Sequence, residues 1–216
     1  MIPLHDQIAD AVCINLKRRV DRWNAFESRA KVAGFGFVRR FEAIDGSALN
    51  LPDKLKTHQG TYGCLHSHAA VYNHALASGY SHVLVVEDDC VFNVSFDDVK
   101  DYLAVTVGAY SWIHLGGSRT CYPQGITRFD SHFQVATVMN THAYVIDQEL
   151  MAGYVRSLEI TPFPQSELLH ADRLILSLCR DRALKISIPL TPFAVQDKGL
   201  TSDVQWGLPR MSSGQQ

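Results

Sequence analysis

The sequence lacks a long hydrophobic run and a basic N-terminal segment leading into one. No apolar stretch approaches the ~20 residues that a membrane-spanning helix needs. The first residues also lack the basic and apolar regions of a signal peptide. We therefore expect a cytoplasmic protein without a transmembrane segment, for which peripheral association with a membrane stays open.

An excess of charge of either sign is also missing. The chain has 20 lysines and arginines against 22 aspartates and glutamates. Binding to nucleic acid depends mainly on contacts between basic side chains and phosphates, so nucleic acid is not an expected partner. Any phosphate contact must be local.

Cysteines are few and widely spaced, and none forms a CxxC pair. The five are Cys13, Cys64, Cys90, Cys121 and Cys179. An odd number without paired spacing argues against a disulfide framework and against a structural zinc site. A reducing compartment fits this pattern best.

The hydrophobic pattern predicts alternating strands and helices. Apolar runs at 11–16 and 37–46 predict strands, and helical spacing marks 17–36 and 61–79. "HVLVVE" (82–87) is apolar without alternation, which is typical of a central strand covered on both faces. The predicted fold class is α/β, with a mostly parallel central sheet flanked by helices.

Further short strands and two helices are expected in the second half. The strands are 111–117, 133–138 and 142–147, and the helices are 148–159 and 170–181. At 46% hydrophobic residues in 216, the chain can form one complete core. We expect a single domain over 1–205 and a flexible tail over 206–216.

Three consecutive carboxylates end the predicted central strand, at Glu87, Asp88 and Asp89. Like charges at the end of a buried strand are costly unless water or a cation neutralises them. Ligands of open α/β sheets gather beyond the carboxyl ends of the strands. Glu87 and Asp89, two residues apart, could share Mg²⁺ or Mn²⁺, whereas a solvated acidic turn is the alternative.

Several stretches, taken in order, resemble glycosyltransferase family 25, which includes lipooligosaccharide and collagen galactosyltransferases. The resemblance extends over roughly residues 11 to 203, and "GTYGCLHSH" is its most specific part. The stretches are "INLKRRVDR" (14–22), "AIDG" (43–46), "GTYGCLHSH" (60–68), "VVEDD" (85–89), "THAYVI" (141–146), "HADRLI" (170–175) and "FAVQDKGLTSD" (193–203).

The resemblance implies one Rossmann-like domain of the GT-A type that takes a nucleotide-diphosphate sugar. It assigns Glu87 and Asp89 to a metal ion, and Asp172 to the base that an inverting transfer requires. The residues it implies for donor binding are Asn15, Arg19, Arg22, Asp45, Ser67, His68, Asp88, Gln196, Ser202 and Asp203.

Structural roles compete with several of these assignments. The arginines could form a solvated helix face, Asp45 could belong only to a turn, and Asp172 could stabilise a helix N-terminus. Three further histidines are accessory ligands or structural residues, namely His114, His142 and His170.

The function expected from this pattern is metal-dependent transfer of a hexose, galactose or glucose, with inversion. The donor is expected to be a nucleotide sugar of the UDP type, and the acceptor a hydroxyl on a lipopolysaccharide or other glycan. Two alternatives stay open: the same chemistry on a protein or modified nucleobase, and a non-catalytic module that binds nucleotide sugars. A nucleotidyltransferase or phosphohydrolase is disfavoured because the sequence has no P-loop and no second cluster of metal-binding histidines.

Overall fold

A six-stranded sheet forms the centre of the protein, in the order β2-β1-β3-β6-β5-β7. The computed structural model describes residues 8–116, 140–161, 170–189, 191–197 and 199–200. The strands are β1 (Ile8–Asn15), β2 (Arg39–Glu42), β3 (His82–Glu87), β5 (Trp112–His114), β6 (Ala143–Asp147) and β7 (Ile186–Ser187). Only β6 runs antiparallel to its neighbours in this sheet, which confirms the mostly parallel α/β fold.

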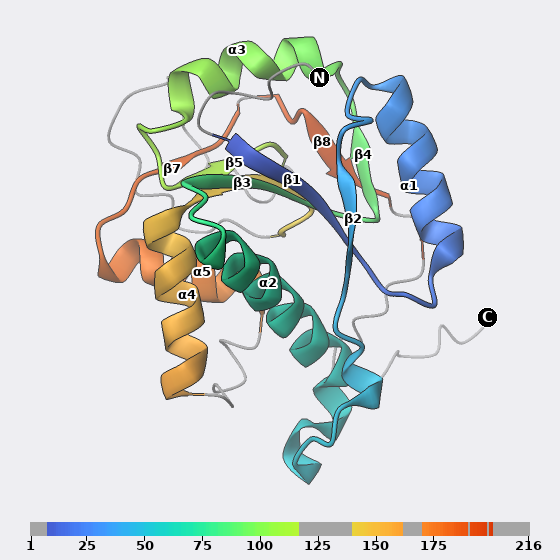
Figure 1. Cartoon of the computed structure of the whole chain (residues 1–216), viewed down its shortest axis with the longest axis vertical. Helices are drawn as coiled ribbons and strands as arrows, with labels where there is room; N and C mark the ends of the chain where they lie inside the picture. Colours follow the sequence, from blue (N-terminus) through green and yellow to red (C-terminus); the bar gives the residue numbers. More distant parts are fainter. Residues whose placement is uncertain (1–7, 117–139, 162–169, 190, 198, 201–216) are drawn as a thin grey trace, which may run out of the picture.

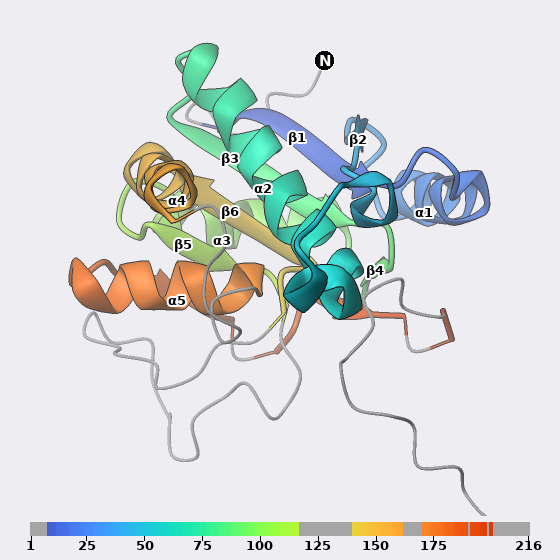
Figure 2. The same ribbon diagram turned by 90° about the horizontal axis from the view of Figure 1, so that it is seen from below.

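Helices cover both faces of this sheet. One face packs against α2, α4 and α5, and the other against α1 and α3 (Figures 1 and 2). Their bounds are α1 (Val20–Val32), α2 (Gln59–Ala77), α3 (Phe96–Thr106), α4 (Gln148–Ile160) and α5 (Ala171–Asp181). Within the described residues, none of these helices has both the length and the apolarity to cross a bilayer.

The unbroken apolar run of β3 follows from this double cover. Val83 and Val85 pack in the hydrophobic cluster with α2, α4 and α5. Leu84 and Val86 pack in the cluster with α1 and α3. Successive strand residues point to opposite faces, so each must be apolar when both faces are covered by helices.

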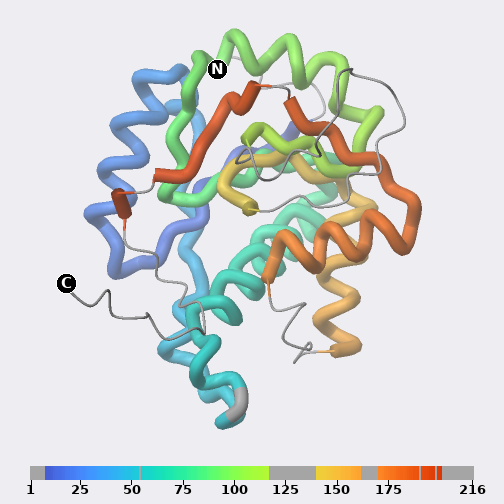
Figure 3. The backbone as a smooth tube through the Cα atoms, turned by 180° about the vertical axis from the view of Figure 1, so that it is seen from behind, coloured from blue at the N-terminus to red at the C-terminus, as the bar shows by residue number. Residues whose placement is uncertain are grey.

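A second, two-stranded sheet brings a late segment of the chain next to the acidic run. Strand β4 (Cys90–Phe92) pairs antiparallel with β8 (Ala194–Gln196), and Cys90 lies opposite Gln196. Figure 3 shows the two segments side by side, although about 100 residues of sequence separate them. The residues after β8 therefore lie beside the end of β3.

The predicted elements that lie within the described residues are found in the structure, with bounds that differ by a few residues. The helix expected over 17–36 is α1, from Val20 to Val32, and the helix expected over 61–79 is α2, from Gln59 to Ala77. Helix α3 and strands β4, β7 and β8 were not predicted. The strand expected over 133–138 and the tail expected over 206–216 lie outside the described residues.

The N-terminal half of α2 contacts the loop after β2 at very short range. A Cβ atom at Gly46, in the 3-10 helix η1 (Gly46–Ala48), would lie 1.7 Å from the carbonyl oxygen of Gln59. A Cβ at Gly63 would lie 2.6 Å from the amide nitrogen of Gly46. Glycine is required at both positions because backbone meets backbone there. A further 3-10 helix, η2 (Asp53–His58), leads into α2.

Replacing Gly46 with alanine should destabilise the protein, because the added methyl group overlaps a backbone carbonyl that cannot swing aside. We expect Gly46→Ala to lower the free energy of unfolding by roughly 1–3 kcal/mol in urea titrations. The control is Gly36→Ala, whose Cβ would lie 3.3 Å from Cγ of the flexible Lys31 side chain and at an ordinary contact distance of 3.7 Å from the Lys31 backbone. Its effect should stay within about 0.5 kcal/mol. Equal effects of the two variants would contradict the packing described here.

Candidate active site

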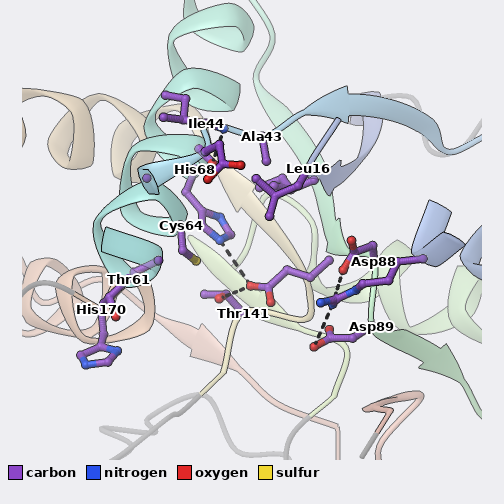
Figure 4. A pocket seen from close by; sticks show the side chains of 18 of the residues that line it. Leu16, Ala43, Ile44, Thr61, Cys64, His68, Asp88, Asp89, Thr141 and His170 are labelled. Atoms are coloured by element: carbon purple, nitrogen blue, oxygen red, sulfur yellow. Dashed lines mark hydrogen bonds and ion pairs between the residues drawn. The ribbon is translucent and has the colours of Figure 1, made fainter. Parts of the chain in front are cut away.

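A cavity of about 570 Å³ opens at the carboxyl edge of the parallel strands. Its walls come from the end of β3, the η1 loop, the start of α2, the residues before β6, the start of α5 and the residues after β8 (Figure 4). Many residues expected from the sequence line it together: Arg22, Asp45, Ser67, His68, Glu87, Asp88, Asp89, Asp172 and Gln196.

Two of the expected residues do not line the cavity. The buried amide of Asn15 donates hydrogen bonds to Asp88 and to the carbonyl of Arg19, so it lies behind the acidic run. The Arg19 side chain contacts Asp21 instead of the cavity. Ser202 and Asp203 lie outside the described residues.

A buried guanidinium lies between two of the three acids. Arg22, at the start of α1, forms ion pairs with Asp88 and, at 3.6 Å, with Asp89 (Figure 4). The side chains of Arg22 and Asp88 are only 7% and 9% exposed. The acidic run is therefore partly neutralised from within the protein and is not a solvated turn.

The surroundings of Asp89 disfavour its negative charge in spite of the contact with Arg22. One carboxylate oxygen, Oδ2, accepts a hydrogen bond of 3.1 Å from Gln196. The other, Oδ1, is buried and has no hydrogen-bond partner among the described residues. Burial and the nearby charge of Glu87 raise the pKa of Asp89 to about 7. Burial also raises the pKa of Asp88, against the opposing effects of Arg22 and Asn15.

Glu87 turns toward α2 instead of toward Arg22. Its carboxylate accepts a hydrogen bond from Thr141, and Oε1 lies 3.3 Å from Nε2 of His68. Burial alone would raise the pKa of Glu87, but the contacts with His68 and Thr141 lower it below the usual value. Glu87 thus keeps its negative charge inside the cavity.

His68 is held by a chain of buried hydroxyl groups. Its Nδ1 atom lies 2.7 Å from the hydroxyl of Tyr144, which in turn is hydrogen bonded to Tyr72. All three side chains are fully buried. Tyr72 also packs in the hydrophobic core.

Ser67 and Asp45 shape the wall of the cavity through local hydrogen bonds. The Ser67 hydroxyl donates to the carbonyl of Gly63 and accepts from the amide of Ile44. Asp45 caps η1 by accepting from Ser47 and pairs with Arg18 at 2.8 Å. These hydrogen bonds from Ser47 and Arg18 lower the pKa of Asp45.

Asp172 enters the cavity from α5. Its two carboxylate oxygens accept hydrogen bonds of 2.8 Å, from the backbone amides of Asn140 and Arg173. Asp172 therefore has the contacts of a first-turn helix acid and also faces the cavity. The interpretation as a first-turn acid of a helix is confirmed, and the role of Asp172 as the base stays a prediction.

Two of the three candidate histidines are not in the cavity lining and have backbone partners. His114 donates from Nε2 to the carbonyl of Asn140 and accepts at Nδ1 from the amide of Gly116. Burial lowers its pKa to about 3, so it is neutral. His142 contacts the carbonyl of Ala194, whereas His170 lines the cavity.

Sequence reasoning missed several residues that line the cavity. Cys64, Arg18 and Thr141 are examples. Cys64 lies inside the "GTYGCLHSH" motif, so its position there was a usable signal. Thr141 is the first residue of the "THAYVI" stretch, and it meets Glu87 because β6 pairs with β3.

The sequence matches a family profile described as glycosyltransferase family 25 (LPS biosynthesis protein), over residues 9–168. The chain belongs to glycosyltransferase family 25. It is therefore a glycosyltransferase, as the order of motifs in the sequence indicated. A search of curated proteins gives no match.

Solved glycosyltransferases share the fold of this family 25 protein. One is a glycosyltransferase involved in the glycosylation of the major capsid of PBCV-1, with a TM-score of 0.54 and 9% identity. The alignment covers 89% of this chain and 94% of that one. GlyE of Streptococcus pneumoniae TIGR4 aligns with a TM-score of 0.50 and 11% identity, over 95% of this chain and 58% of that one. At these identities the similarity concerns the fold alone.

Removing the guanidinium of Arg22 should leave the carboxylates of Asp88 and Asp89 without the positive charge that they contact. We expect Arg22→Met to lower the free energy of unfolding by roughly 3–5 kcal/mol at neutral pH, measured by denaturant titration. Lys31→Met is the control, since Lys31 and Glu27 form an exposed pair whose loss should cost about 1 kcal/mol or less. Adding Asp88→Asn to Arg22→Met should recover part of the loss. A cost for Arg22→Met as small as that of the control would contradict the buried ion pair.

Proposed function

We propose that this family 25 protein transfers a hexose from a UDP-sugar to an acceptor hydroxyl, with inversion and with the help of Mn²⁺ or Mg²⁺. The observation that carries the proposal is the acidic edge of this cavity, in which Asp88 is buried and Glu87 and Asp89 are partly exposed. Family membership supports glycosyl transfer, and the acids supply a place for a cation next to a diphosphate.

The residues at this edge fit a hard divalent cation. Carboxylate oxygens are the ligands that Mg²⁺ and Mn²⁺ prefer. The buried Oδ1 atom of Asp89 lacks a hydrogen-bond partner among the described residues, and Glu87 raises the pKa of Asp89 by its charge. Both features favour a positive ion near Glu87 and Asp89. When bound, such an ion would neutralise the charge that develops on the departing diphosphate.

Basic and polar side chains around the edge suit the rest of the donor. Arg18 and Lys56 line the cavity, where they could contact phosphate oxygens. Asp45 could accept a hydrogen bond from ribose or uracil, and the apolar side chains of Ile14 and Leu16 offer a surface for the base. Arg22 is held by Asp88 and Asp89, so we assign it to the acidic edge first.

Asp172 is the proposed general base. It faces the same cavity as the acids but comes from α5, a different element. The amides of Asn140 and Arg173 hold its carboxylate in place. An inverting transfer needs a base on the side of the sugar opposite the leaving group, and a fixed carboxylate there can accept the proton of the acceptor hydroxyl.

A glycan acceptor is proposed because the family is described as an LPS biosynthesis family. We further propose a cytoplasmic location, which the free cysteines Cys13, Cys64, Cys90 and Cys179 support because thiols persist in a reducing compartment.

Donor binding should depend on the metal and on the acidic edge. Among UDP-, GDP-, CMP- and dTDP-sugars with Mn²⁺, we expect one class to raise the melting temperature, since a ligand at 100 times its Kd stabilises by about 2.7 kcal/mol. The shift and slow donor hydrolysis should disappear with EDTA and in Glu87→Gln/Asp89→Asn.

The matched control is Asp97→Asn/Asp101→Asn, which removes two exposed acids of α3. It should keep the full shift. If none of the donors raises the melting temperature, the assignment of the donor site is wrong. Binding without hydrolysis or transfer would point to the non-catalytic module.

Asp172→Asn should separate donor binding from turnover. The amide can keep one hydrogen bond from the backbone but cannot accept a proton, so we expect the hydrolysis rate of the bound donor to fall about 100- to 10,000-fold with the thermal shift retained. Glu149→Gln, in the first turn of α4, is the control and should hydrolyse the donor at the normal rate. An Asp172→Asn variant that works at the wild-type rate would exclude Asp172 as the base.

A further inference from the structure

Three potential metal ligands converge on one wall of the cavity: Cys64, His68 and Glu87. One ligand atom from each, a sulfur, a nitrogen and an oxygen, lies within 4.8 Å of the other two. Cys64 and His68 are four residues apart on α2, so their side chains lie on the same face of the helix (Figure 4). Glu87 reaches them from the end of β3.

The surroundings of His68 leave one ring nitrogen available at this point. The Nδ1 atom is hydrogen bonded to Tyr144, and Nε2 faces Glu87 at 3.3 Å without the alignment of a hydrogen bond. His68 is completely buried, and Nε2 points to the carboxylate of Glu87 at the wall of the cavity. Histidine ligands of metals have this arrangement, with one nitrogen held by a hydrogen bond and the other presented to the ion.

Glu87 is oriented from a second side. Thr141 donates a hydrogen bond to the same carboxylate oxygen that faces His68. Hydrogen-bonded carboxylates and histidines are typical of metal sites whose geometry is set in advance. The side chains therefore need little rearrangement to meet a common ion.

The charge of the region favours a cation over an added negative charge. The carboxylates of Glu87 and Asp172 line the same cavity as Cys64. A dication that displaces the thiol proton into the solvent leaves the cluster less negative than the ionised side chains alone.

We propose that Cys64, His68 and Glu87 form a second cation site, which takes Zn²⁺ in place of the Mn²⁺ or Mg²⁺ of the transfer reaction. A mixed sulfur, nitrogen and oxygen donor set suits zinc, whereas magnesium and manganese prefer oxygen. Zn–S and Zn–N bonds of ~2.3 and ~2.0 Å place tetrahedral ligands about 3.5 Å apart, so shifts of about 1 Å complete the site. All three residues line the cavity, so a water molecule from the cavity could serve as the fourth ligand.

Glu87 is also a proposed ligand of the Mn²⁺ or Mg²⁺ ion, so zinc binding at this site affects the transfer reaction. Zinc bound to Glu87 holds that carboxylate toward α2 and withdraws it from an ion at Asp89. Zinc therefore competes with the ion of the transfer reaction. Zinc binding itself does not depend on the proposed function, because none of its ligands requires the donor.

Cobalt provides the direct test, since Co²⁺ in such a site gives a thiolate-to-metal charge-transfer band in the near ultraviolet. We expect the band in the wild-type protein, its removal by added Zn²⁺, and its loss in Cys64→Ser. Cys179→Ser, which changes a buried cysteine of α5, is the matched control and should keep the band. Asp89→Asn should keep it as well, which separates this site from the one proposed for Mn²⁺.

Calorimetric titration with Zn²⁺ extends the test to the residues around the ligands. Tyr144→Phe removes the hydroxyl that orients His68, and we expect zinc affinity to fall about 10- to 100-fold. The zinc affinity of Cys64→Ser should fall further, because this variant loses one of the ligands. Wild-type affinity in Cys64→Ser, or a cobalt band that persists in it, would overturn the proposal.

A measurement on the unmodified protein guards against variants that fail to fold. Zn²⁺ should slow alkylation of Cys64 by a small maleimide, followed by mass spectrometry of the peptide, whereas Mg²⁺ should not. Equal alkylation rates with and without Zn²⁺ would also overturn the proposal.

Discussion

The ion pair between Arg22 and the acids that follow β3 is the contact on which the cavity depends. A guanidinium at the start of α1 lies against Asp88 and Asp89 with almost no exposure to water. Buried charges are tolerated only when they are paired and hydrogen bonded, so the first helix and the central strand must hold fixed positions relative to each other. Asn15 strengthens this link by donating to Asp88 from the end of β1.

The three acids of the run have different partners, although they are consecutive in sequence. Glu87 contacts His68 and Thr141, and Asp88 contacts Arg22 and Asn15. Asp89 contacts Gln196 and, at the longer distance of 3.6 Å, the same Arg22. The pKa of Glu87 is lowered whereas that of Asp89 is raised. Environments that shift the pKa values of neighbouring carboxylates in opposite directions are typical of functional sites. They allow one acid to stay charged while another depends on a cation.

Residues at the start of α2 contact both the η1 loop and the cavity. Gly63 and Ser67 contact the η1 loop, where the glycine allows the backbones to meet and the hydroxyl joins them. Cys64 and His68, each one residue further along, turn toward Glu87. Within the "GTYGCLHSH" motif, some residues therefore position the loop that forms the wall, and others present reactive atoms to the cavity.

The sequence by itself determined the α/β fold, the central strand at 82–87 and the place of the acids at its carboxyl end, because apolar periodicity and strand ends are local properties. Helix α3 was missed although Ser95 and Asp98 form a capping box before it, a signal that was available. Only the tertiary structure decided which side chains meet. Cys64 joins Glu87, and Thr141 reaches the same carboxylate, through strand pairing and helix packing between distant segments. Local patterns carry no information on such contacts, because burial of the whole core selects them.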